Sequence, residues 1–265
     1  MVTKVLGTSG NDDISIPLLF PGDTGEFEVR GRKGDDRIVG SAQDDVLIGG
    51  KGDDTILGGF GDDTIVAGKH DDYVDGGAGA DDISGNLGND TLYGGKGADT
   101  IDGGQGDDFI YGVKGNNTLS GGAGNDTIDT GLNGTKVDGG SGEDHIKANA
   151  IKGGWHTLTG GTEADTFEFY GMGAKKRSLA TITDFEIGVD DFIIAGVSDD
   201  DYMASLMAGE AEAIMTQNGA DTVLRLDKGL TLTFADTDME ELQAAYADAP
   251  LIDIEIGVGI GIEIG

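Results

Sequence analysis

A nine-residue pattern repeats thirteen times between residues 31 and 147, without the gain or loss of a single residue. Clear copies are GGKGDDTIL at 49–57, GGFGDDTIV at 58–66 and GGQGDDFIY at 103–111. Self-similarity at such a short, fixed period indicates a solenoid, in which each unit buries its apolar face only against its neighbours. The pattern therefore predicts an elongated array with end-pieces on either side.

The eighth place of the pattern is apolar in every unit, whereas the seventh and ninth places are mixed and mostly polar. This alternation predicts a three-residue strand whose middle side chain points inward. One inward residue per strand makes a thin core, so two strands must face each other across it. The six residues G-G-x-G-x-D between strands are then expected to form a turn, because glycine accepts a positive φ without steric cost.

The sixth place is aspartate in eleven of the thirteen units. If two units make one coil, every second turn stacks on the same side about 4.8 Å away. The aspartates then form two ladders, one of which contains Asp36, Asp54 and Asp72. Two unit charges about 5 Å apart repel by about 0.8 kcal/mol in water, and by more at lower dielectric. Such ladders are not expected to fold without neutralisation.

A hard divalent cation between successive turns would remove this repulsion, with carboxylates and turn carbonyl groups as oxygen ligands. Calcium suits such a site better than magnesium, which demands a tight octahedron and retains its waters. A disordered glycine-rich chain and a metal-free solenoid are the less favoured alternatives. The predicted ligands are Asp12, Asp36, Asp45, Asp54, Asp63, Asp72, Asp81, Asp90, Asp99, Asp108, Asp126, Asp144 and Asp165, with the turn glycines Gly49, Gly52, Gly58, Gly61, Gly76, Gly79, Gly94, Gly97, Gly103, Gly106, Gly121 and Gly124.

The array has irregular units and ends. An isolated copy at 7–15 precedes an insertion at 16–30, which we interpret as an N-terminal cap. Asn117 and Thr135 replace aspartate at place six, so their calcium sites are expected to be weak or missing. After residue 147, three residues break the register. The pattern then resumes with His156 in place of aspartate.

The C-terminal part changes character. Residues 179–196 are predicted to form two strands around a turn at Gly188, and residues 199–208 a short helix. The segments 211–216 and 222–227 flank Asn-Gly and predict a hairpin. A helix is expected from Thr237 to about residue 248, since Glu240 completes a capping box.

The last fourteen residues alternate strictly between apolar and polar or glycine, from Ile252 to Ile264. This pattern predicts a long two-faced strand. Three uses are open for it. It packs on its own C-terminal domain, it is part of an export signal, or it completes a sheet in the next subunit of a filament.

The repeat array, together with GGTEADTFEF, ITDFEIGVDDFII and NGADTVLRLD further along, resembles the calcium-binding RTX (repeats-in-toxin) proteins, including the C-terminal parts of serralysin-type proteases. The resemblance implies an all-β fold, a parallel β-roll or β-solenoid, with a small mixed C-terminal capping domain. It also implies export by a type I secretion system. The expected division is an N-terminal repeat and cap at 1–30, the roll at 31–168, a cap and secretion region at 169–250, and a strand tail at 251–265.

Composition limits the function classes. A net charge of −33 excludes a nucleic-acid partner, because a phosphate backbone needs lysine and arginine to displace its counterions. No membrane insertion is expected, since no stretch reaches the length of a transmembrane span. The chain contains no cysteine and no cleavable N-terminal signal, which suits a protein exported to the extracellular space or cell surface.

No enzyme is expected. The three histidines lie on separate repeats, and a regular solenoid offers no cleft in which one carboxyl could be tuned as an acid. Trp155 beside His156 suggests a sugar-stacking spot, although a contact with the repeat core is the favoured interpretation. The predicted function is a secreted structural protein that folds on calcium and assembles into homo-oligomers or filaments. The alternative is an accessory module for a secreted partner enzyme.

Overall fold

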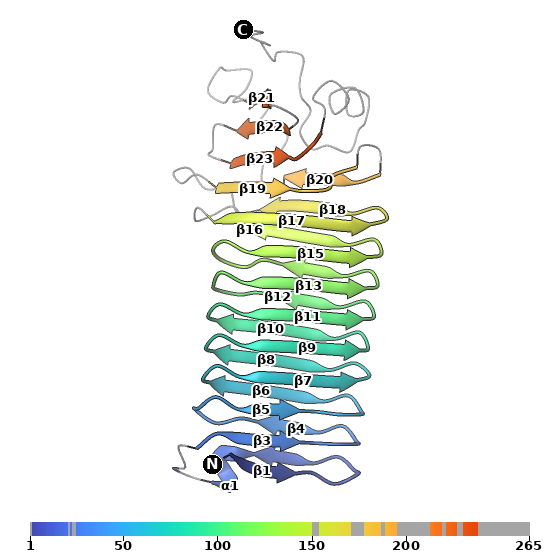
Figure 1. Cartoon of the computed structure of the whole chain (residues 1–265). Helices are drawn as coiled ribbons and strands as arrows, with labels where there is room; N and C mark the ends of the chain where they lie inside the picture. The colour runs from blue at the N-terminus through green and yellow to red at the C-terminus, as the bar shows by residue number, and fades with distance from the viewer. Residues whose placement is uncertain are drawn as a thin grey trace.

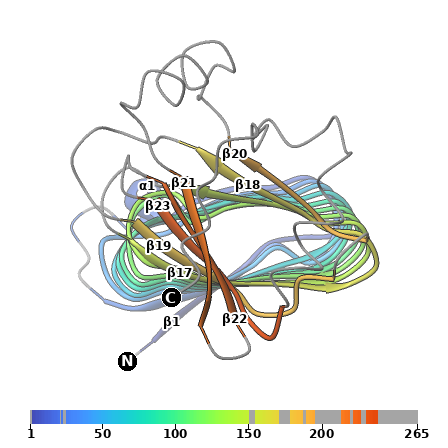
Figure 2. The ribbon, with the colours of Figure 1, turned by 90° about the horizontal axis from the view of Figure 1, so that it is seen from above.

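The chain winds into a flattened coil with one β-sheet on each side (Figures 1 and 2). The computed structural model describes residues 2–20, 22, 25–149, 154–170, 178–186, 189–194, 213–218, 221–226 and 230–237. In the repeat array, odd-numbered strands and even-numbered strands pair in separate sheets, so each coil crosses both. The fold is therefore a parallel β-solenoid, as predicted.

Within the described residues, one sheet contains thirteen strands and the other ten. The thirteen-stranded sheet contains, in order, β1 (Thr3–Leu6), β3 (Phe27–Arg30), β5 (Val46–Ile48), β7 (Thr64–Lys69), β9 (Asp82–Leu87), β11 (Thr100–Gln105), β13 (Thr118–Ala123), β15 (Lys136–Ser141), β17 (Trp155–Thr162), β19 (Ser178–Ile182), β23 (Leu230–Phe234), β22 (Asp221–Leu226) and β21 (Ala213–Asn218). The ten-stranded sheet contains β2 (Asp13–Ser15), β4 (Arg37–Val39), β6 (Thr55–Phe60), β8 (Tyr73–Ala78), β10 (Thr91–Lys96), β12 (Phe109–Tyr111), β14 (Thr127–Asp129), β16 (His145–Asn149), β18 (Thr166–Tyr170) and β20 (Asp191–Ile194).

Two nine-residue units make one coil, so paired residues in the array are eighteen apart. Ile56 pairs with Val74 and Leu92 with Ile110, in parallel register. All thirteen eighth-place side chains are buried and stack into one continuous core. The predicted period and core are thus confirmed. Each unit contributes one large apolar side chain, so stability depends on stacking between coils rather than on any single coil.

The strands are longer than the sequence predicts. In most units the strand has six residues, for example Thr55–Phe60, and the turn is reduced to places four to six. The prediction of a six-residue turn is wrong because glycines at places one and two also pair with the neighbouring coils, as Gly59 does with Gly77. The first glycine points inward beside the sixth-place aspartate, where a Cβ would collide with the carboxylate.

The N-terminal insertion belongs to the coil. Phe27–Arg30 forms β3, which lies between β1 and β5 in the thirteen-stranded sheet. The short helix α1 (Ile16–Leu19) lies at the N-terminal end of the stack (Figure 1), and Ile16 is buried there. The segment 16–30 therefore contains a short helix at the N-terminal end of the stack and a strand, neither of which the sequence analysis predicted, and its role as a cap stays a prediction.

The C-terminal elements extend the solenoid by one coil. Strands β19 and β20 are both present as predicted, but they lie in opposite sheets rather than folding back on each other around Gly188. The hairpin is confirmed as β21 and β22, which pair antiparallel, and β22 also pairs with the unpredicted β23. The predicted helix at 199–208, the helix beyond Thr237 and the tail 251–265 lie outside the described residues. Within the described part of the chain, no helix is long and apolar enough to cross a lipid bilayer.

Candidate calcium sites

The sixth-place aspartates form two ladders at the corners of the coil. The long ladder lies where the chain enters the ten-stranded sheet, and the short ladder lies where it enters the thirteen-stranded sheet. The long ladder contains Asp12, Asp36, Asp54, Asp72, Asp90, Asp108, Asp126, Asp144, Asp165 and Asp190, and the short ladder contains Asp45, Asp63, Asp81 and Asp99. The two predicted columns of carboxylates are therefore present.

Each rung of a ladder is joined to the next by a hydrogen bond from the main chain. The backbone N–H of Asp54 donates to Oδ1 of Asp72 at 2.7 Å, and that of Asp72 donates to Oδ1 of Asp90 at 2.8 Å. The three-residue register break does not interrupt this contact, because the N–H of Asp144 reaches Oδ1 of Asp165 at 3.0 Å. One oxygen of each aspartate is thus satisfied by the preceding coil.

The side chains at place five form further columns of hydrogen bonds, which the sequence analysis missed. These bonds run in the opposite direction along the stack to those at place six. Oδ1 of Asp62 accepts the N–H of Ala80 in the following coil at 2.7 Å, and Oδ1 of Asp71 accepts that of Asn89 at 2.8 Å. The frequent aspartate and asparagine at place five is the signal that could have revealed it. Side chains at places five and six therefore bind the coils on both sides.

The other oxygen of most sixth-place aspartates is buried and has no hydrogen-bond partner. This applies to Oδ2 of Asp36, Asp54, Asp63, Asp72, Asp81, Asp90, Asp99, Asp108, Asp126 and Asp144. A buried polar atom without a partner has a substantial desolvation cost, about 1–3 kcal/mol and more for a charged group. Ten such atoms in ordered columns point to a missing positive charge.

Burial makes the charged form of these carboxyls unfavourable. Burial and, to a smaller extent, repulsion from carboxylates such as Asp36 raise the pKa of Asp54 to about 6. Burial likewise raises the pKa of Asp63 to about 7 and that of Asp72 to about 8, where Asp90 and Asp54 add repulsion. Loss of water is the main cause in each case, and like-charge repulsion within the ladder adds to it.

The hydrogen bonds of Asn117 indicate which group lies opposite the unpaired Oδ2 of a sixth-place aspartate. Its Oδ1 accepts the N–H of Asp99, as an aspartate would, while its Nδ2 donates to the carbonyl oxygen of Gly112 at 2.8 Å. Gly112 is at place one of the same unit. At an aspartate rung, Oδ2 takes the position of this nitrogen, so two oxygens face each other without a hydrogen between them. A cation is the group that satisfies both.

The backbone conformation at place two distinguishes aspartates with an unpaired Oδ2 from those whose Oδ2 accepts a hydrogen bond. In all ten units with an unpaired Oδ2, the residue at place two has a positive φ. Its N–H is directed to the next coil, as from Gly50 to the carbonyl of Ala67 at 2.8 Å. The exceptions lie near the two ends of the stack: the N–H groups of Thr8, Ser41 and Glu186 donate to Oδ2 of Asp12, Asp45 and Asp190, respectively.

The predicted glycines have two positions relative to these oxygens. Those at place one, Gly49, Gly58, Gly76, Gly94, Gly103 and Gly121, lie against Oδ2 of their own unit, where a Cβ would take the space. Those at place four, Gly52, Gly61, Gly79, Gly97, Gly106 and Gly124, have positive φ values and form the turn itself. The first group borders the space where a cation fits, and the second shapes the corner around it.

The donor set fits calcium. Carboxylate and carbonyl oxygens are the ligands of a hard cation, and nitrogen or sulfur ligands are not required. Among the described residues, no three acidic or histidine side chains converge on one point. Each ion would therefore take carbonyl oxygens together with carboxylates from adjacent rungs. When bound, calcium supplies positive charge that neutralises these oxygens and joins successive coils.

Two acidic rungs near the C-terminal end complete the long ladder. Asp165, predicted as a ligand, lies against Gly160 as the array aspartates lie against their first glycine, and burial raises its pKa to about 7. Asp190 was missed, and its place follows from the pairing of the next two residues, Asp191 with Thr166 and Phe192 with Phe167. Its Oδ1 accepts the N–H of Asp165 at 3.0 Å.

Comparison with known families supports the same conclusion. The model of the RTX calcium-binding nonapeptide repeat, in four copies, matches residues 30–65, 48–83, 57–92, 75–110, 84–119 and 102–134. No curated protein matches the chain. Such nonapeptide repeats bind multiple calcium ions. The solenoid of this chain is thus an RTX-type β-roll with calcium as its cofactor.

Proposed function

We propose that this chain is a secreted structural protein whose roll folds when calcium binds outside the cell. The observation that carries the proposal is the column of buried Oδ2 atoms without a hydrogen-bond partner. Without calcium, desolvated like charges at the corners oppose stacking of the coils. With calcium, binding energy becomes folding energy, because the sites do not exist in the unfolded chain.

The calcium set consists of the ten aspartates with an unpaired Oδ2, together with Asp165. Asp12 and Asp45, which the sequence also predicts as ligands, bind no calcium in this proposal. Their Oδ2 atoms already accept the N–H groups of Thr8 and Ser41, each at 2.6 Å. The backbone N–H therefore satisfies the oxygen that would otherwise need a cation.

Counting bound calcium in matched variants tests this set. Asp63→Asn retains the Oδ1 acceptor for the N–H of Asp45, and its new amide can donate to the carbonyl of Gly58, as Asn117 does to Gly112. We expect equilibrium dialysis to show the loss of at least one ion. The control, Asp45→Asn, should retain the wild-type number. An unchanged number in Asp63→Asn would contradict the assignment.

Export in the unfolded state follows from the same dependence of folding on calcium. Extracellular calcium modules typically bind with a Kd of about 10⁻⁴ to 10⁻³ M, so the chain stays open where calcium is scarce. We expect the full chain to reach the medium only in cells with a type I secretion system. Equal secretion without that system would overturn this part of the proposal and leave calcium binding untouched.

Assembly through the tail is the most specific part of the proposal. The alternating segment 252–264 has the pattern of a strand that completes a neighbouring sheet. Among the described strands, β1 and β21 end the thirteen-stranded sheet. Deletion of residues 252–265 should abolish assemblies seen by electron microscopy in calcium, whereas unchanged assemblies would refute strand donation.

A further inference from the structure

Three successive corners on the short-ladder side have lost every acidic residue. Places five and six are Asn116 and Asn117 in the first of these coils, Gly134 and Thr135 in the second, and Trp155 and His156 in the third. Earlier coils at the same corner contain Asp44 with Asp45, and Asp62 with Asp63. A neutral patch three coils deep is thus built into a chain with a net charge of −33.

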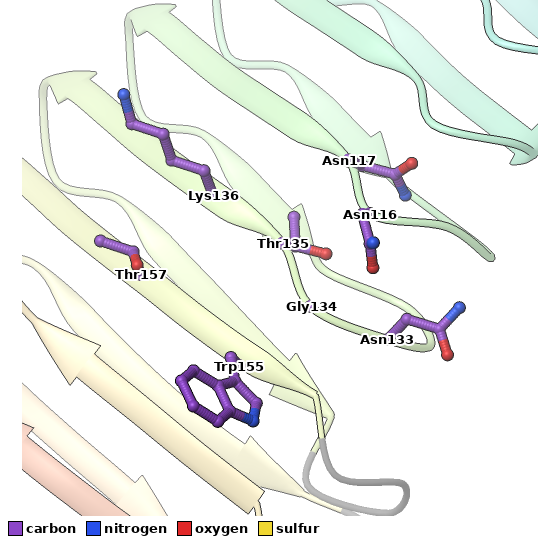
Figure 3. Close-up of a pocket in the computed structure, with 8 residues that line it drawn as sticks. All are labelled: Asn116, Asn117, Asn133, Gly134, Thr135, Lys136, Trp155 and Thr157. Carbon is purple, nitrogen blue, oxygen red and sulfur yellow. The ribbon is translucent and has the colours of Figure 1, made fainter.

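The patch is hollowed. A cavity of about 600 Å³ is open to solvent here and spans the three coils, with Asn116, Asn133, Thr135 and Trp155 in its lining. In Figure 3 the Trp155 indole lies on one side of Gly134 and Thr135, and the side chains of Asn116 and Asn117 lie on the other. The hollow coincides with the places where uncharged residues replace the aspartate rungs.

Trp155 faces solvent rather than the core. It is 75% exposed, so the predicted core contact is wrong for this residue, while His156 beside it is buried, as predicted. The reason is the alternation of the strand: place six points inward, and place five points outward. A large indole at place five therefore exposes an apolar face beside the hollow.

Polar groups are available around that face. The side chains of Asn117 and Thr135 donate hydrogen bonds to the place-one carbonyl oxygens of their own units, so they form part of the wall. Asn116 and Thr157 are exposed. Among the described residues of the lining, Lys136 is the single charged one. The hollow thus combines one aromatic surface, amide and hydroxyl groups, and no carboxylate.

We propose that this hollow binds a neutral saccharide, with one sugar ring stacked on Trp155. A sugar ring has an apolar C–H face and a rim of hydroxyl groups, which match an indole and adjacent amides. Polyanionic glycans are disfavoured because the chain as a whole has an excess of acidic residues, with a net charge of −33. The site is independent of the calcium ligands, since its corner contains no acidic residue.

Trp155 is the only tryptophan of the chain, so its fluorescence reports directly on the site. The full chain, saturated with calcium, is titrated with neutral glucan, xylan and galactomannan oligosaccharides, and with alginate oligosaccharides for comparison. We expect a saturable blue shift with at least one neutral oligosaccharide and none with alginate. No saturable change with any neutral oligosaccharide, or equal binding of alginate, would overturn the proposal.

Variants locate the site by calorimetry. Trp155→Ala should weaken binding at least about tenfold, and Asn116→Asp, which places a carboxylate at an exposed position of the lining, should also weaken it. The matched control is Phe60→Ala, which removes an aromatic ring that is 66% exposed and remote from the hollow. Circular dichroism in calcium checks that each variant folds. Binding that survives Trp155→Ala, or is lost equally in Phe60→Ala, would refute the site.

Discussion

The two ladders start from the same repeat and end differently. The long ladder has an acidic rung in every coil from Asp12 to Asp190, even across the register break. The short ladder contains four aspartates and then passes through Asn117, Thr135 and His156. The difference teaches that the buried oxygens at a corner of this roll can be satisfied in three ways. A cation can bind them, the N–H at place two can donate to the carboxylate, or a side chain at place six can donate a hydrogen bond to the carbonyl oxygen.

The three ways have different dependence on solution conditions. A rung with an unpaired Oδ2 needs calcium or a proton. Asp45 needs neither, because Ser41 supplies the hydrogen, and Asn117 carries its own donor. Calcium dependence is therefore unevenly distributed over the molecule, and it is greatest along the long ladder.

Removal of calcium should have the largest effect. A site loaded at 100 times its Kd contributes about 2.7 kcal/mol, and whole domains are stable by only about 5–15 kcal/mol. We expect chelator to lower the urea midpoint of the roll strongly and to remove part of the β-sheet signal in circular dichroism. Calcium should restore this signal, and magnesium should do so poorly. An intact signal in chelator would show that the ladders tolerate their charge unaided.

A lower pH should partly replace calcium. Burial raises the pKa of Asp54 to about 6 and that of Asp72 to about 8, above the unfolded value of about 3.9. The folded state therefore binds more protons than the unfolded state, and the free energy of unfolding falls as pH rises from about 4 to about 8.

Urea titrations in chelator at about pH 5 and about pH 8 measure this dependence. We expect a higher urea midpoint at the lower pH. In calcium the trend should weaken or reverse, because protons compete with the metal for the same oxygens. A midpoint in chelator that rises with pH would contradict the role of buried carboxyls.

Asn117→Asp should extend the short ladder by one rung. In chelator the new Oδ2 would face the carbonyl of Gly112 without a hydrogen, so we expect a loss of about 1–3 kcal/mol in the free energy of unfolding. In calcium the variant should bind at least one additional ion, and the loss should shrink. Dialysis and urea unfolding under both conditions distinguish this from simple damage, which would destabilise equally.

The smallest effects should come from place two. Arg32 has a φ of 94°, a conformation that costs an ordinary residue about 1–2 kcal/mol, so Arg32→Gly should raise the free energy of unfolding by about 1 kcal/mol. Ser41 has no such strain, and Ser41→Gly should lower it by about 0.5–1 kcal/mol. Thermal unfolding in calcium measures both, and a shared sign would argue against the place-two distinction.

The repeat made much of the fold predictable. A strict nine-residue period with an apolar eighth place determines the two sheets, the core and the two aspartate columns, because each depends on spacing alone. Strand length was not predictable, since glycine is compatible with both a turn and a pleated strand. Whether Gly59 pairs with Gly77 depends on contacts between coils.

The chemistry of individual rungs was less accessible from sequence. Asp45 and Asp63 occupy the same place in the pattern, and only the direction of the place-two N–H distinguishes them. The sequence predicted strand β20 but did not identify Asp190, which directly precedes it, as a rung of the long ladder. Asp190 lies outside the unbroken array, so the nine-residue spacing does not reach it. Trp155 was misjudged because the register after the three-residue break determines which side of the strand it faces.

The sixth-place hydrogen bonds give the stack a direction. The backbone N–H of each coil donates to a sixth-place carboxylate of the coil on its C-terminal side, and Asp190 is the last such acceptor among the described residues. The place-five carboxylates run the other way, because they accept N–H groups from the following coil. A coil that docks on either end of the stack therefore meets one kind of acceptor already held in place, so the two kinds of ladder together let each coil serve as a template for both of its neighbours.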